Sequence, residues 1–251
     1  MEKRIHRTAV IVLTIALISL SLGLSQGIAA DLASIIQEAK VKYVPFEKTV
    51  KDMTILGETK MVTPQGEMFS TIKIFKKGEK FRTETIMSIP QIAEAPEGME
   101  EIVTTIIYDG KDYWMISPFM GKKKLSSAEE KQYQTERNWW EWVSEKAELA
   151  GEDKIDGRVC YIIRIKEENA TATRMWLDKT SLILVKMEAQ WEKGKTVLIL
   201  FSNFRKIKGD WEMAYKTDVS EGGKLLSSTL IKTVDINKGL SDDLFNPDKV
   251  G

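Results

Sequence analysis

Histidine and cysteine are almost absent from this 251-residue chain, which has one of each. The histidine, His6, lies close to the N-terminus, so residues 31–251 contain none. Without an imidazole that titrates near neutral pH, this part of the chain cannot carry Ser-His-Asp or Cys-His triads or zinc sites with histidine ligands. Cys160 has no partner for a disulfide or a C-x-x-C redox motif and is expected to be a packed, inert thiol. We expect neither a metal nor a cofactor.

An excess of charge of one sign is also missing, because 37 Lys and Arg residues balance 37 Asp and Glu residues. Residues 1–30 contain three of the basic residues and one acidic residue, so the rest of the chain carries a net charge of −2. Proteins that bind nucleic acid usually have a basic surplus on one face. We therefore expect no nucleic-acid partner.

The only long apolar run extends from Ala9 to Leu24. Basic residues precede it, and the small pair Ala29-Ala30 follows it, which is typical of a cleavable signal peptide over residues 1–30 and of export by the general secretory route. The alternative is an uncleaved membrane anchor, although the run is at the short limit for spanning a bilayer. No cysteine that could accept a lipid follows the run.

Residues 31–251 show no Pro/Gly/Ser-rich linker and are expected to form a single domain. Apolar residues at helical spacing predict a short amphipathic helix over 32–43 that ends before Pro45. The sequence Ser127-x-x-Glu130 resembles a capping box and predicts a second helix over 127–143. Residues 89–100, rich in Pro, Ala and Glu, are expected to form a loop or a short helix.

From Met53 onward, the period of the apolar residues changes to two, and turn signals separate the runs. About eleven strands are predicted, and hairpin connections make them antiparallel; residues 224–236 are a twelfth candidate. The predicted strands cover residues 53–62, 67–77, 80–88, 101–108, 111–117, 146–154, 158–166, 173–178, 182–191, 196–208 and 211–221. The fold class is therefore mainly β (α+β), with a strongly curved sheet or an incomplete barrel covered in part by the helices.

The chain is rich in methionine and tryptophan, with 11 and 7 residues, respectively. Methionine adapts its shape and is common on surfaces that accept variable apolar ligands. Strand alternation suggests a cavity-facing set, although period two leaves the choice between the two faces open. The residues expected to line the cavity are Trp114, Ile116, Met175, Met187, Trp191, Trp211, Met213 and Tyr215. Trp139, Trp140 and Trp142 are expected to form a lid, in which at least one of the adjacent pair meets the barrel mouth, solvent or a partner.

Two kinds of charged run have a simple surface interpretation. The pairs Glu129-Glu130, Glu167-Glu168 and Asp242-Asp243 are interpreted as solvated, although a carboxylate enzyme would need two such groups at one cleft. Lys122-Lys123-Lys124 is interpreted as a solvated strand edge that discourages edge pairing, with contact to acidic lipid headgroups or an acidic partner as the alternative.

Four motifs together resemble the LolA-like superfamily of periplasmic lipoprotein-sorting proteins. They are Asp109-Gly-Lys-x-x-Trp114, Gly151-x-x-x-x-Asp156-Gly-x-x-Cys160-Tyr161, Trp176-Leu-Asp178, and an ending from Asn237 through Leu240 and Asp242 to Phe245. The resemblance spans residues 50–248. It implies an unclosed antiparallel barrel, lidded by helices, that holds the acyl chains of lipoproteins or lipids. The family's carrier closes its lid through an arginine on an early strand, for which Arg82 is the nearest candidate.

Three hypotheses follow. The first is an exported, monomeric, non-catalytic carrier of lipid or lipoprotein acyl chains, which receives its cargo from a membrane donor complex. The second is a periplasmic sensor or scaffolding module that uses the same barrel to bind a protein partner. The third is an enzyme that acts through carboxylates alone.

Overall fold

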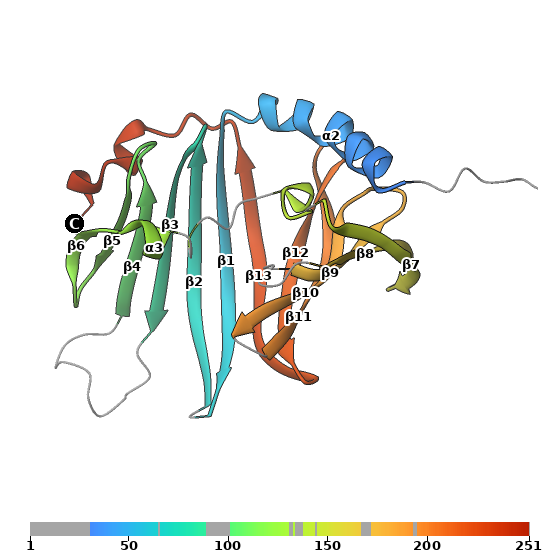
Figure 1. The fold of residues 1–251 in the computed structure, drawn as a ribbon. Coiled ribbons are helices and arrows are strands. Elements are labelled where there is room, and N and C mark those ends of the chain that lie inside the picture. Colours follow the sequence, from blue (N-terminus) through green and yellow to red (C-terminus); the bar gives the residue numbers. More distant parts are fainter. Residues whose placement is uncertain are drawn as a thin grey trace, which may run out of the picture.

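An antiparallel sheet of thirteen strands makes up most of the computed structural model (Figure 1). The structure describes residues 31–64, 66–88, 101–130, 133, 138–143, 145–166, 172–192 and 195–250. The strands are β1 (Asp52–Thr63), β2 (Gly66–Lys77), β3 (Lys80–Ser88), β4 (Glu101–Tyr108), β5 (Tyr113–Ser117), β6 (Gly121–Lys124), β7 (Ala147–Ile155), β8 (Arg158–Ile165), β9 (Ala172–Asp178), β10 (Leu184–Glu192), β11 (Lys195–Lys208), β12 (Trp211–Glu221) and β13 (Lys224–Ile236). The predicted segments at 1–30 and 89–100 lie outside the described residues.

The strand order is β6-β5-β4-β3-β2-β1-β13-β12-β11-β10-β9-β8-β7. Strands β1–β6 and β7–β13 are therefore two meanders of sequential hairpins, and the pairing of β1 with β13 joins them. Strands β6 and β7 form the two edges, so the sheet does not close into a full barrel. The predicted fold class, a mainly β chain with an unclosed antiparallel sheet, is confirmed.

Twelve of the strands correspond to predicted ones, including the candidate at 224–236, which forms β13. The one strand that was not predicted is β6. It contains Gly121 and three lysines, so it has no apolar alternation from which a strand could be predicted. All four of its residues are exposed, and it is an edge strand, as the interpretation of the lysine run proposed.

The N-terminal helix α2 (Leu32–Thr49) continues past Pro45, so the prediction that it ends before this residue is wrong. Asp31 caps its start, because its carboxylate accepts a hydrogen bond from Ser34 N at 2.7 Å. Ile35, Ala39 and Tyr43 are its buried residues, four positions apart. Proline removes only one helical hydrogen bond, and packing of this buried face compensates for that loss.

The single helix predicted over 127–143 is not present as such. The helices among the described residues of this segment are α3 (Ser127–Glu130) and a 3₁₀ helix, η1 (Trp139–Glu141). The cap also differs by one residue, since the Glu129 carboxylate accepts hydrogen bonds from Ser126 N at 2.8 Å and Ser126 Oγ at 2.7 Å. Ser126 and Glu129 therefore take the places predicted for Ser127 and Glu130, and the Glu129 carboxylate is the acceptor in both hydrogen bonds.

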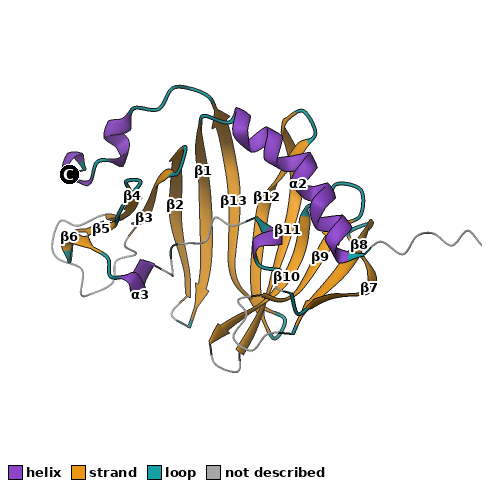
Figure 2. Ribbon diagram, turned by 45° about the horizontal axis from the view of Figure 1, so that its top comes forward, coloured by secondary structure: helices purple, strands orange, loops and turns teal. Residues whose placement is uncertain are grey.

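The hydrophobic core unites α2 and η1 with strands β8 to β11. In Figure 2, α2 runs along one end of the strands in this half of the sheet. At the other half, the 3₁₀ helices η2 (Asp242–Phe245) and η3 (Pro247–Lys249) follow the last strand, and Phe245 is buried. Within the described ranges, no helix has the length and apolar character needed to cross a membrane.

Candidate functional site

A cleft of about 650 Å³ lies where the end of α2 meets the starts of β1 and β12. We call it the α2 cleft. Its walls are formed by Glu47, Val50, Lys51, Asp52, Met53, Lys76, Gly78, Asn138, Trp211 and Met213. Ligand sites typically measure ~300–1,000 Å³ and combine apolar walls with a few polar groups. The volume of the α2 cleft lies in this range, and its walls combine apolar residues with as many charged or polar ones, so it can accept a molecule with both an apolar and a polar part.

The cleft wall is fixed where α2 joins β1. Asn237, just after β13, accepts a hydrogen bond from Lys51 N at 2.7 Å and donates one from its amide to the Thr49 carbonyl at 2.9 Å. The buried Asp52 carboxylate accepts hydrogen bonds from Lys238 N at 2.8 Å and Gly239 N at 3.0 Å. The junction is therefore tied to the opposite end of the chain.

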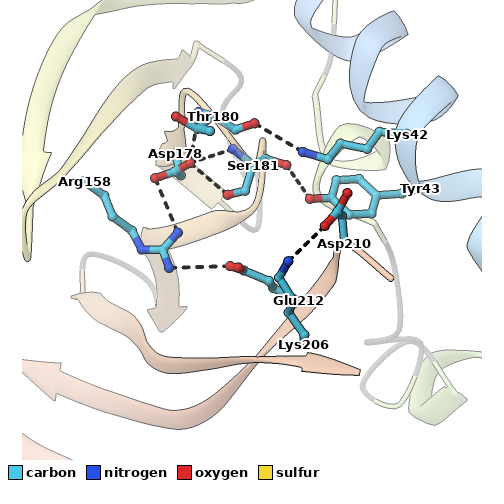
Figure 3. Close-up of polar contacts among 9 residues, drawn as sticks. All are labelled: Lys42, Tyr43, Arg158, Asp178, Thr180, Ser181, Lys206, Asp210 and Glu212. Atoms are coloured by element: carbon cyan, nitrogen blue, oxygen red, sulfur yellow. Dashed lines mark hydrogen bonds and ion pairs between the residues drawn. The ribbon is translucent and has the colours of Figure 1, made fainter. Parts of the chain in front are cut away.

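The helix is also held to the turn between β9 and β10 (Figure 3). The Tyr43 hydroxyl donates a hydrogen bond to the Ser181 carbonyl, and Lys42 Nζ donates one to the Thr180 carbonyl at 3.2 Å. Asp178 shapes this turn, since one carboxylate oxygen accepts from Ser181 N at 2.6 Å and Thr180 N at 3.0 Å.

Arg158 connects this turn to β12. Its guanidinium lies 3.4 Å from Asp178 Oδ2 and 3.5 Å from Glu212 Oε2 (Figure 3), and it stacks 4.7 Å from the centroid of Phe204. Strands β8 and β12 are not neighbours in the sheet, which means that the sheet curves enough for Arg158 to span between them.

Burial and charge set two pKa values here. Burial, followed by the nearby carboxylates of Glu212, Asp178 and Asp210, raises the pKa of Tyr43 to about 12. For Asp178, burial by itself raises the pKa, but hydrogen bonds from Ser181 and Thr180 and the charge of Arg158 outweigh it and lower the pKa below its usual value. Tyr43 therefore stays a neutral donor and Asp178 an anion at neutral pH.

The predicted lid residues lie on η1 and next to it. Trp139 and Trp140 are buried, and Trp142 is half-buried. Trp139 Nε1 donates to the Leu182 carbonyl at 2.9 Å, and Trp140 stacks on Tyr43 at 6.4 Å between centroids. The adjacent pair therefore packs against α2 and the β9–β10 turn, and its role as a lid stays a prediction.

The residues predicted to line the cavity divide into groups. Trp211 and Met213 lie in the wall of the α2 cleft. Met175 and Met187 are opposite each other on β9 and β10 and are buried in the core. Tyr215 is buried beneath the Arg205 guanidinium, which lies 4.3 Å from its centroid. The side chain of Trp191 lies outside the described part of the chain.

Trp114 and Ile116 point to the other face of the sheet. The face that carries Met187 on β10 can be followed from strand to strand through the residues paired across the sheet. When it reaches β5, this face carries Tyr113 and Met115. The residues along the path are Ile199, Val219, Ser227, Met61, Met68, Ser70, Met87, Ile102 and Ile106. Trp114 faces the opposite way, and its Nε1 donates to Asp109 Oδ2 at 3.0 Å.

Several cleft residues were not predicted from the sequence. Val50 and Met53 flank the helix–strand junction, and Asn138 comes from the segment before η1. The apolar alternation of β1 includes Met53, but no sequence signal places the start of β1 and the start of β12, which lie on either side of β13, in the wall of one cleft. Arg82 is the candidate for the arginine that closes the lid. Its partners are Glu84 and, in the C-terminal segment, the Leu244 carbonyl, which lies 3.2 Å from Nη1.

No group of three or more His, Cys, Asp or Glu side chains among the described residues could hold a metal ion. The described carboxylate pairs instead meet lysines. Asp242 lies 3.0 Å from both Lys77 and Lys80, and Glu129 lies 2.6 Å from Lys123. Cys160 is buried, and burial followed by the charge of Asp178 raises its pKa. Its environment is that of a packed thiol.

Comparison with solved structures identifies similar folds, including the following three. A domain from Vibrio parahaemolyticus described as an outer membrane lipoprotein-sorting protein domain has a TM-score of 0.60 at 17% identity, covering 85% of this chain and 95% of its own. A LolA superfamily protein from Nitrosomonas europaea has a TM-score of 0.55 at 15% identity, covering 88% and 100%. A DUF1329 family protein from Desulfovibrio piger has a TM-score of 0.55 at 17% identity, covering 84% and 97%.

No curated protein matches the sequence. A family model with the description "Uncharacterized protein" matches residues 104–250, which is more than half of the chain. The matched segment includes strands β5 to β13 and the residues of the Arg158–Asp178 network. The chain therefore belongs to the family that this model describes, and its fold is similar to that of the LolA superfamily protein from Nitrosomonas europaea.

Proposed function

We propose that this protein is an exported, non-catalytic carrier that binds lipid or lipoprotein acyl chains in the α2 cleft. The observation that carries the proposal is the cleft itself, about 650 Å³ in volume, with Met53, Trp211 and Met213 in its walls beside charged residues. The similarity in fold to a domain described as lipoprotein-sorting supports the same function. The mature chain would be the single domain 31–251, monomeric and periplasmic, with residues 1–30 as a cleaved signal peptide. The alternative is that they remain as a membrane anchor.

Partial burial of the chain suits a carrier better than complete burial. Each buried CH₂ contributes ~0.8 kcal/mol, so complete burial of a 16-carbon chain approaches ~12 kcal/mol. Complete burial of three chains would exceed the affinity ceiling of ~18–21 kcal/mol and prevent release. The α2 cleft lies at the end of an unclosed sheet, and we infer that it covers the acyl chains of its ligand only in part.

Two residues on one strand provide a matched test. Met53 lies in the cleft wall, whereas Met61 is on the same face of β1 but eight residues away, or about 26 Å at ~3.3 Å per residue. Both side chains are half-buried. We expect Met53→Glu to weaken binding of a fluorescent long-chain fatty acid at least tenfold, because a carboxylate placed against the acyl chain is poorly solvated. Met61→Glu should leave binding unchanged. Equal effects of the two substitutions would contradict binding in the α2 cleft.

The natural ligand can be sought directly. Extraction of the purified mature protein and mass spectrometry should detect phospholipid or acylated peptide. Trp211 is in the cleft wall, so its fluorescence should respond to added fatty acid, and Trp211→Phe should remove that part of the response. Reproducibly empty protein and no fluorescence response would instead favour the sensor or scaffolding function, in which a donor complex has no role.

A further inference from the structure

The tip of the β5–β6 hairpin exposes two large apolar side chains. Phe119 and Met120 are adjacent in the turn between these strands, and they are 63% and 58% exposed. Single exposed apolar residues are common on protein surfaces. Two consecutive exposed apolar residues at the tip of an edge hairpin are less common, because together they form one continuous apolar patch.

The turn has a defined shape. Ser117 and Gly121 are the last paired residues of the hairpin, and Met120 N donates a hydrogen bond to the buried Ser117 Oγ at 3.2 Å. Gly121 has φ +63°, which a residue with a side chain adopts at a cost. Because the backbone is already ordered, the apolar tip can contact a surface without a large loss of conformational entropy.

Three consecutive lysines follow the tip. The side chains of Lys122, Lys123 and Lys124 are 41%, 48% and 52% exposed. Lys122 and Lys124 point to one face of the hairpin and Lys123 to the other. Their present partners are the carboxylates of Asp248, Glu129 and Asp112. Exposed ion pairs contribute little to stability, so these lysines can exchange a carboxylate for another anion at low cost.

We propose that this tip docks on an anionic membrane surface, with Phe119 and Met120 entering the interfacial region and the three lysines contacting lipid phosphates. A planar, negatively charged surface is favoured because the lysines flank the apolar tip on both faces of the ribbon. Contact from both sides is possible when the hairpin approaches the plane end-on. The hairpin is at the edge of the sheet far from α2 (Figure 1), so docking leaves the α2 cleft accessible.

Co-sedimentation of the purified protein with vesicles tests this proposal. We expect binding to phosphatidylcholine vesicles that contain phosphatidylglycerol, and at least tenfold weaker binding to phosphatidylcholine alone, since each lysine near an anionic surface contributes roughly a factor of five. Phe119→Ser should weaken binding to the anionic vesicles by about tenfold or more, because a phenylalanine side chain is no longer transferred from water. Replacement of all three lysines by glutamine should weaken it by at least tenfold.

Matched controls lie far from the tip. Val41 is 65% exposed on α2, and Val41→Ser should leave vesicle binding unchanged. Lys206 forms an exposed pair with Asp210, and Lys206→Gln should also have no effect. Failure of the wild type to bind anionic vesicles, equal binding to both vesicle types, or an equal loss with Val41→Ser and Phe119→Ser would each overturn the proposal. Because fatty-acid binding is measured without vesicles, its outcome is independent of this one.

Discussion

Aspartates organise the turns in which the family-like motifs occur. In the Asp109-Gly-Lys-x-x-Trp114 motif, the Asp109 carboxylate accepts hydrogen bonds from Lys111 N at 2.8 Å and Asp112 N at 2.9 Å, as well as from Trp114. In Trp176-Leu-Asp178, the aspartate shapes the turn that holds α2, and Trp176 donates to Asp153 Oδ2 at 3.0 Å. At the scale of residues, these motifs are therefore structural anchors.

Asp178 should make stability depend on pH in the acid range. Its pKa in the folded protein is below the usual 3.8, so folding favours the anion. The resulting stabilisation is complete above the usual pKa and is lost as the pH falls through the lowered value. We expect Asp178→Asn to reduce the free energy of unfolding by about 1–3 kcal/mol at pH 7 and by less at pH 3. Denaturant unfolding at both pH values measures this; a difference from the wild type that is the same at both would contradict it.

The Tyr43 hydroxyl can be separated from its ring by substitution. Tyr43→Phe keeps the stacking on Trp140 but removes the hydrogen bond to Ser181, and we expect a loss of about 1 kcal/mol in the free energy of unfolding. Tyr43→Ala also removes the ring and should cost about 3–5 kcal/mol, as for other large aromatic side chains in cores. Thermal or denaturant unfolding of the two variants distinguishes them. Equal losses would show that the hydroxyl dominates.

At the scale of elements, α2 depends on its contacts with the sheet. An isolated helix of this length is marginal in water, and this one contains a proline. Its buried face packs into the core, whereas its termini are held by the Asp31 cap and by Asn237. The helix therefore forms one wall of the α2 cleft because tertiary contacts place it there.

Two substitutions within α2 test this dependence. Ile35 is 2% exposed in the core, so Ile35→Ala should lower the free energy of unfolding by about 2–4 kcal/mol. Val41 is on the solvent side of the same helix, and Val41→Ala should change it by less than about 0.5 kcal/mol. Circular dichroism during denaturant unfolding provides the measurement. Similar effects of the two changes would argue against packing as the main source of helix stability.

At the scale of the whole molecule, the pairing of β1 with β13 holds two meanders in one sheet. This pairing joins Met53 to Ile236 and includes a hydrogen bond between the hydroxyls of Thr59 and Thr229 at 2.9 Å. Both strands have neighbours on each side, whereas β6 and β7 have a free edge. The interior strands should therefore be more stable than the two edge strands.

Hydrogen exchange measures this gradient. We expect amides in β1 and β13 to exchange more slowly than those in β6, because opening an edge strand breaks fewer contacts. Mass spectrometry of peptides from each strand resolves the order. Faster exchange in β1 than in β6 would mean that the two meanders separate before their edges fray.

The sequence determined most strands, because alternation and turn residues act over a few positions and need no distant partner. It did not determine β6, because the lysines of this strand give no apolar alternation. It also did not determine that α2 continues past Pro45, because packing of the helix compensates for the hydrogen bond that proline removes. Only the tertiary structure decided which face each strand presents, since a period of two leaves that choice open; it turned Trp114 away from the face that carries Met187. It also created the α2 cleft. That site depends on contacts such as Lys51 with Asn237, 186 residues apart in the sequence, and no local pattern can encode a contact over that separation.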